Sequence, residues 1–67
     1  MEIYVNELKN IEVCVVDELN KIVYCENHRS IGEAEYRARR LYHDYECDDI
    51  SIIFDKKGVK NFLKNSF

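Results

Sequence analysis

The alternation of apolar and polar residues predicts three short strands in the first half of the chain. Residues 11–16 place apolar side chains on both faces, which is typical of a strand in the middle of a sheet. Turn-forming residues at 17–20 join this run to a second β-prone run at 21–26, so the two are expected to form a hairpin. Residues 2–5 alternate over a shorter span and predict a first strand, paired with the second through a turn around Lys9 and Asn10.

The most regular pattern is the amphipathic stretch from Ser30 to Glu46. Ser30 followed by Glu33 is a capping box, in which each side chain satisfies a backbone N–H that the first turn of a helix leaves unpaired. Apolar residues then recur at spacings of three and four and predict one docking stripe on the helix, formed by Ile31, Ala34, Ala38, Leu41 and Tyr45.

A fourth strand is predicted at residues 50–55, where Ile50, Ile52 and Phe54 alternate with polar residues and are expected to face the helix. Residues 56–58 turn the chain, and apolar residues at helical spacing predict a short C-terminal helix: Val59, Phe62, Leu63 and Phe67.

The element order is therefore β-β-β-α-β-α. It predicts a single α+β domain, residues 1–67, with a small antiparallel sheet of three to four strands and one main helix packed on one face. Some apolar residues of strands 11–16 and 50–55 do not face the helix, so they are expected on an open face of the sheet. These are Cys14, Val16 and Ile53, together with Tyr4 and either Tyr24 or Val23.

Length and composition limit the functional classes. A chain of 67 residues buries only about three fifths of the surface that it exposes when unfolded, so a partner or a second copy would add stability. The three cysteines, Cys14, Cys25 and Cys47, are an odd count and do not form the dense framework of small secreted scaffolds. We therefore expect reduced cysteines packed as small hydrophobes and a cytoplasmic protein, with neither an export signal nor a membrane-spanning segment.

Charge is unevenly distributed although the net charge is only −3. Four arginines fall within residues 29–43. Residues 44–55 then carry five acidic and no basic residues, and the last twelve residues contain four lysines. Such blocks predict surface patches of opposite sign, which favour oriented encounter with a charged partner.

The sharpest chemical hypothesis is a zinc site, because Cys25, His28, His43 and Cys47 form two close pairs of suitable ligands. The predicted helix separates these pairs, since a rise of about 1.5 Å per residue puts His43 roughly 20 Å beyond Ser30. We therefore expect no metal and no other cofactor, unless the helix begins far later than the capping box indicates or two antiparallel chains bring the pairs together. No serine has a natural base partner and no glycine-rich phosphate loop is present, so we also expect no catalysis.

Nucleic-acid binding is the alternative function, because Arg29, Arg37, Arg39 and Arg40 lie on or beside one helix. Glutamates stand four residues before Arg37 and Arg39, an orientation that favours intrahelical ion pairs and would occupy both cations. The acidic net charge also opposes binding that depends on counterion release, so direct nucleic-acid binding ranks below protein binding.

Protein binding has the most specific support. The chain has five tyrosines, and tyrosine and arginine are the residues in which interface anchors are enriched. The candidate partner-binding residues are the helix flank Tyr36, Arg37 and Arg40, the acidic residues Asp44, Asp48 and Asp49, and the open-face residues Tyr4, Tyr24 and Ile53.

In general character the chain resembles the small proteins of phages and mobile elements, including anti-CRISPR inhibitors. The likeness lies in the compact acidic composition and the β-β-β-α-β order across the whole chain, and in no single motif. It implies a stoichiometric inhibitor of a larger nuclease or effector complex, with the acidic region 44–55 imitating nucleic-acid phosphates, and it leaves room for a homodimer.

Overall fold

The computed structural model describes residues 1–8 and 10–65 and confirms the α+β class and the element order. The strands are β1 (Glu2–Asn6), β2 (Glu12–Val16), β3 (Ile22–Asn27) and β4 (Asp49–Ile53), and the helices are α1 (Ile31–Asp44) and α2 (Val59–Asn65). The predicted turn residue Lys9 and the last predicted apolar residue of the C-terminal helix, Phe67, lie outside the described residues.

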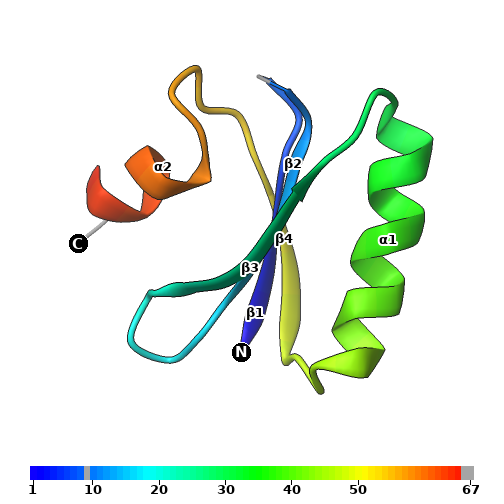
Figure 1. Ribbon diagram of the computed structural model, residues 1–67. Helices are drawn as coiled ribbons and strands as arrows, with labels where there is room; N and C mark the ends of the chain where they lie inside the picture. Colours follow the sequence, from blue (N-terminus) through cyan, green and yellow to red (C-terminus); the bar gives the residue numbers. More distant parts are fainter. Residues whose placement is uncertain (9, 66–67) are drawn as a thin grey trace.

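The four strands form one sheet in the order β3-β2-β1-β4. β1 and β2, and β2 and β3, pair antiparallel, whereas β4 returns across α1 and pairs parallel to β1, so the sheet is mixed. The two helices lie on opposite sides of this sheet (Figure 1).

The hairpin between β2 and β3 closes through the turn-forming residues that the sequence indicates. The Asp17 carboxylate accepts hydrogen bonds from the backbone N–H groups of Leu19 and Lys21, each at 2.9 Å. Asn20 takes a positive φ of 61°, which asparagine tolerates better than most residues. The register slips in the pairing next to this turn, and Val23 is the extra residue of the resulting irregularity.

α1 begins as predicted, because the Ser30 hydroxyl accepts a hydrogen bond from the Glu33 N–H at 3.2 Å. The other half of the capping box is not formed, since the Glu33 carboxylate lies near His28 instead. The middle of the predicted stripe is buried against the sheet: Ala34, Ala38 and Leu41. Its two ends are more open, since Ile31 is 44% exposed and Tyr45 37% exposed.

One core fills the space between α1 and the sheet. Its buried members are Ile3, Val5, Val13, Val15, Ala34, Ala38, Leu41 and Cys47. Of the fourth-strand residues expected here, Ile50 packs against this core, but Ile52 is 53% exposed and Phe54 67% exposed. Ile52 does lie on the α1 side of the sheet, beside Glu35 and Arg39, but β4 is an edge strand and α1 does not cover this position. Phe54 follows the end of β4, so the expectation that both side chains pack under the helix is wrong.

A second core lies on the other face of the sheet, under α2. It contains Cys14, Val16, Ile53, Val59 and Leu63, with Tyr4, Ile22 and Phe62 packed around it. The prediction that this face is open is therefore wrong: a helix of seven residues is enough to bury it. Ile53 is buried and Tyr4 is half-buried, in ring contact with Phe62 at a centroid distance of 5.9 Å.

The start of α2 is fixed by polar side chains from the first two strands. Asn6 is fully buried, and its amide donates to the Asp55 carbonyl at 2.9 Å and accepts from the Asp55 N–H at 3.0 Å. The Glu12 carboxylate accepts from the Val59 N–H at 2.9 Å. Together these bonds satisfy polar groups that the sheet and the first turn of α2 would otherwise leave unpaired.

Candidate interaction surface

The outer side of α1 presents an aromatic and a guanidinium group to solvent. Tyr36 is 60% exposed, and Arg40, one turn further along, donates to its hydroxyl at 3.4 Å. Asp44 follows one more turn on and is also exposed. We call Tyr36, Arg40 and Asp44 the helix surface; the sequence predicted all three as partner-binding residues.

The third helix residue of that prediction, Arg37, is engaged elsewhere. Its guanidinium binds the Glu26 carboxylate through two hydrogen bonds of 2.9 Å, from Nε and Nη2. Neither expected intrahelical pair is present. Arg37 binds Glu26 rather than Glu33, because the carboxylate on the neighbouring strand offers the bidentate geometry that guanidinium favours, and no ion pair joins Glu35 to Arg39 among the described residues. Glu33 instead places a carboxylate oxygen 3.8 Å from His28 Nδ1.

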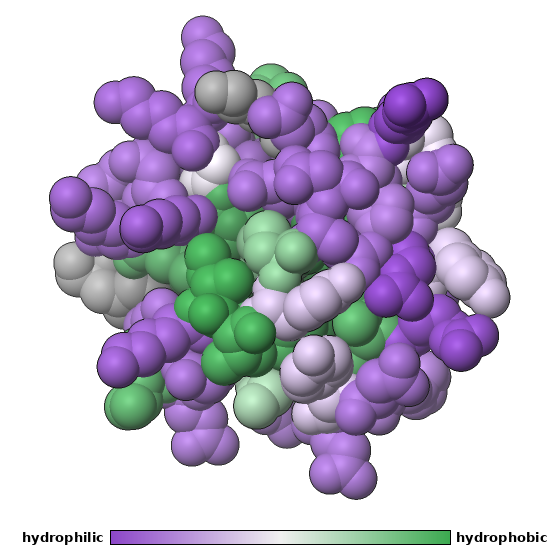
Figure 2. Space-filling view, viewed as in Figure 1, coloured by the Kyte–Doolittle hydropathy of each residue, from purple (hydrophilic) through white to green (hydrophobic). Residues whose placement is uncertain are grey.

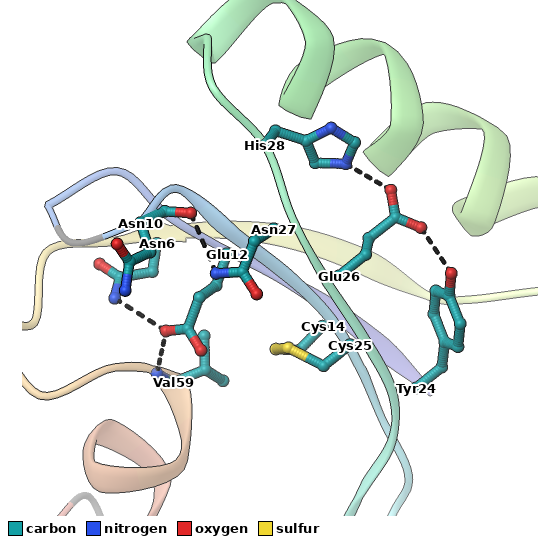
Figure 3. The surroundings of a disulfide bond; sticks show 10 residues. All are labelled: Asn6, Asn10, Glu12, Cys14, Tyr24, Cys25, Glu26, Asn27, His28 and Val59. Atoms are coloured by element: carbon teal, nitrogen blue, oxygen red, sulfur yellow. Dashed lines mark hydrogen bonds and ion pairs between the residues drawn. A yellow bond between two sulfur atoms is a disulfide. The ribbon is translucent and has the colours of Figure 1, made fainter.

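Glu26 is the centre of this cluster on the α1 side of β3. Besides Arg37, the Tyr24 hydroxyl donates to it at 2.8 Å and His28 Nε2 forms a short contact with its other oxygen (Figure 3). These partners, Arg37 first, lower the pKa of Glu26 from 4.5 to about 2, although burial acts in the opposite direction. The cluster joins β3 to α1 at the edge of the main core.

Tyr24 belongs to this cluster and therefore lies on the α1 side of the sheet. Its ring stacks on Tyr45 with centroids 6.3 Å apart, and it is 39% exposed. The sequence predicted that either Tyr24 or Val23 would lie on the opposite face of the sheet, and Tyr24 does not.

On the face of the molecule drawn in Figure 2, hydrophobic surface gathers near the middle and hydrophilic side chains surround it.

Carboxylates gather at the end of the molecule where β1 and β4 begin. Glu2 and Asp49 are register partners in these parallel strands. The Met1 ammonium lies 3.2 Å from the Asp48 carboxylate, which raises the pKa of the amino group. We call Glu2, Asp48 and Asp49 the acidic end; Asp48 and Asp49, both exposed, are predicted partner-binding residues that the structure brings together.

Lysines line a groove near the other helix. The groove has a volume of about 540 Å³, lies between α2 and the β2–β3 turn, and is lined by Asn20, Lys21, Ile22, Lys60, Leu63 and Lys64. The sequence blocks of opposite charge thus become separate patches on the folded surface.

The cysteine prediction is corrected by the structure. Cys14 and Cys25 face each other directly across β2 and β3 and form a disulfide, rather than packing as reduced side chains (Figure 3). Cys14 is fully buried under α2 and Cys25 is exposed. Cys47 is a free thiol, and burial raises its pKa.

The residues considered as zinc ligands occupy separate environments. Cys25 is bonded to Cys14, and His28 contacts Glu26, whereas the sulfur of Cys47 lies 3.9 Å from a backbone carbonyl of α1. His43 is exposed at the end of α1, in edge contact with the neighbouring tyrosine ring. The described donor atoms that do converge, within 4.8 Å, come from Glu12, Cys14 and Cys25, and two of these are joined in the disulfide.

Several residues that shape the surface were not singled out from the sequence. Glu26 and Ile52 are the most important, because the first occupies Arg37 and the second leaves an apolar side chain on an open strand edge. The sequence does carry a signal for Glu26, which is the only acid in the run 21–26 and alternates with Tyr24 on one face.

Comparison with known proteins adds no assignment: no family model, curated protein or solved structure matches this chain. Within the described residues, neither helix is long and apolar enough to span a bilayer.

Proposed function

We propose that this protein is a non-catalytic protein-binding module that acts as a stoichiometric inhibitor or regulator of a larger nuclease or effector complex, in the manner of anti-CRISPR proteins. The observation that carries the proposal is the helix surface, where Tyr36 is 60% exposed and in hydrogen-bond contact with Arg40. A tyrosine and an arginine held together in solvent contribute little to the core and are the residue types on which protein interfaces depend most.

The acidic end supports the choice of partner. Glu2 and Asp49 lie side by side on β1 and β4, and Asp44 and Asp48 are exposed on the segment that leads from the end of α1 to β4. The Met1 ammonium partly offsets the charge of Asp48, so the phosphate-like charge rests mainly on Glu2, Asp44 and Asp49. A protein that binds nucleic acid presents basic residues in its binding channel, so a row of carboxylates next to aromatic and arginine contacts suits such a channel. In this proposal the carboxylates imitate phosphates, and the helix surface provides the protein-specific contacts.

Direct nucleic-acid binding through α1 stays the alternative, because the helix offers few free cations. Arg37 is bound by Glu26 in a bidentate pair, so one of the three helix arginines is already neutralised. The remaining pair, Arg39 and Arg40, is exposed on a helix that ends in Asp44 beside the acidic end. Fewer free cations mean fewer released counterions and weaker binding to phosphates.

We propose that the protein acts in the cytoplasm, as the inhibitor function implies. We further propose that the chain forms a homodimer.

Two binding measurements test the proposal against its alternative. The double variant Tyr36→Ala with Arg40→Ala keeps α1 helical, since alanine is the best helix former, and removes the central contacts of the helix surface. Affinity capture from the native host with wild-type protein should recover a partner that this variant loses. Leu19→Ala, at a 75% exposed position in the β2–β3 turn, is the matched control and should retain that partner.

The second measurement is binding to generic DNA and RNA at increasing salt. We expect no binding at physiological salt. Micromolar binding that weakens steeply with salt and disappears in the double variant would support the nucleic-acid alternative instead.

A further inference from the structure

β4 is an edge strand whose outer side has no partner among the described strands. The order β3-β2-β1-β4 leaves it paired only with β1. The Ile53 carbonyl accepts from the Glu7 N–H at 3.0 Å, so the backbone groups of residue 53 point toward β1. Because successive residues of a strand point their N–H and C=O groups to opposite sides, those of Ile50 and Ile52 point outward.

The side chains beside this edge form a groove against α1. The groove has a volume of about 220 Å³ and is lined by Val5, Glu35, Arg39, Ile50 and Ile52. Ile52 is 53% exposed, which is unusual for an isoleucine in a strand, and Glu35 and Arg39 stand one turn apart on the flank of α1 above it.

We propose that this edge binds the same edge of a second copy, antiparallel, about a twofold axis through Ser51. In this register Ile50 lies opposite the partner's Ile52, and the two outward-pointing residues of each copy exchange four backbone hydrogen bonds. The four isoleucine side chains then lie on the α1 face as two facing cross-strand pairs. The Asp49 carboxylate, which now accepts from the Ile50 N–H at 2.8 Å, gives up this local bond to the partner strand.

Charge complementarity favours a second copy as the occupant. The twofold axis reverses the direction of α1, so Glu35 of one copy faces the partner's Arg39, and the same pair forms again on the other side of the axis. α1 lies over β1, with β2 on one side and β4 on the other, so the two helices would be as far apart as the two β1 strands, three strand spacings or about 14 Å. Glutamate and arginine side chains from facing flanks can span a gap of this size.

The opposite edge of the sheet is less suited to pairing. β3 is irregular at Val23, and irregularities of this kind are one way in which native sheets protect their edges. Val23 is 45% exposed, close to the exposure of Ile52, so a lysine at either position introduces a comparable charge.

The dimer would contain one eight-stranded sheet with both α1 helices on the same face. It goes beyond the proposed inhibitor function because it uses a different surface: Tyr36 and Arg40 stay outside the interface, and two copies of the helix surface would be presented together.

Sedimentation analysis over a wide concentration range tests this assignment. The wild-type chain of 8.0 kDa should sediment with twice its mass. Ile52→Lys should raise the dimer dissociation constant at least about tenfold, and Val23→Lys should leave it unchanged. Wild-type protein that is monomeric throughout, or a dimer that Val23→Lys dissociates and Ile52→Lys does not, would overturn the proposal.

A charge exchange provides a second readout if Ile52→Lys does not fold, which circular dichroism would show. Glu35→Arg alone and Arg39→Glu alone each place like charges opposite each other and should weaken the dimer. The double exchange restores opposite charges and should recover most of the affinity. Equal losses in all three variants would refute the antiparallel arrangement. The partner capture that depends on Tyr36 and Arg40 is a separate measurement, so failure of the dimer and failure of the inhibitor function are distinguishable.

Discussion

The cluster around Glu26 makes a quantitative prediction about stability and pH. Its pKa falls from 4.5 to about 2 in the folded protein, chiefly because Arg37 donates two hydrogen bonds to it. A pKa lowered by this amount corresponds to a contribution of about 3 kcal/mol to the free energy of unfolding while Glu26 is ionised. The Arg37 side chain is 36% exposed, and solvent screening reduces the expected contribution to about 1–2 kcal/mol.

The change Glu26→Gln keeps the size of the side chain and removes its charge. Because the folded pKa lies below the ordinary value, the contribution of Glu26 is complete above pH 4.5 and is lost as the pH falls toward 2. Wild-type protein should therefore be more stable than the variant by about 1–2 kcal/mol at pH 7, and this difference should shrink near pH 2.

Urea unfolding followed by circular dichroism at the two pH values measures this difference. Glu33→Gln is the control, since that carboxylate is 64% exposed and contacts only His28, at 3.8 Å; we expect it to cost less than about 0.5 kcal/mol. A loss for Glu26→Gln that is the same at pH 2 as at pH 7 would show that packing, and not the ion pair, supplies the stability.

Four further predictions concern the disulfide, two glycines and a buried asparagine. Reduction of Cys14–Cys25, which closes a loop with a sequence separation of 11, should lower the free energy of unfolding by about 3 kcal/mol in urea titrations with and without a dithiol. Gly58→Ala should destabilise the protein by about 1–3 kcal/mol, because Gly58 has a φ of 104° and an added Cβ would lie 2.7 Å from a carboxylate oxygen of β2. Gly32→Ala should instead stabilise the protein by about 0.5–1 kcal/mol, because alanine favours the helix and nothing lies within 4 Å of the added carbon. Thermal unfolding of the two glycine variants measures both changes in stability. Asn6→Ala should cost about 1–3 kcal/mol in the same assay, because the Asp55 and Leu8 N–H groups lose their acceptor and the Asp55 carbonyl loses one of its two donors.

The sequence predicted the parts of this fold that depend on local interactions. The cap at Ser30 and the buried stripe through Ala34, Ala38 and Leu41 follow from contacts within a few residues, and both are present. The strand assignments also hold, because the period-2 alternation reports on burial against a neighbouring layer.

Tertiary contacts account for what the sequence did not predict. Whether the C-terminal helix packs on the sheet depends on Asn6 and Glu12, which fix its first turn from 47 and more residues away. Its position decides whether Ile53 is a surface residue or a core residue. Arg37 similarly had partners within its own helix, but the strand placed Glu26 in better geometry.

The candidate surface was predicted in part. Tyr36, Arg40, Asp44, Asp48 and Asp49 are exposed as expected, because their positions follow from helical periodicity and from the acidic composition of the segment after the helix. The edge position of β4 could not be inferred, since strand order in a sheet is set by the path of the chain across α1 and not by the pattern within the strand.

The most direct test of the central claim is a titration of this protein against a panel of RNA-guided nuclease complexes, with target cleavage as the readout. For the complex that is its partner, wild-type protein should abolish cleavage at an equimolar ratio. The Tyr36→Ala, Arg40→Ala double variant should require at least about a tenfold higher concentration, which corresponds to 1.4 kcal/mol or more of lost binding energy. Cleavage that persists at a large molar excess of wild-type protein with every complex, or inhibition that the double variant leaves unchanged, would contradict the account.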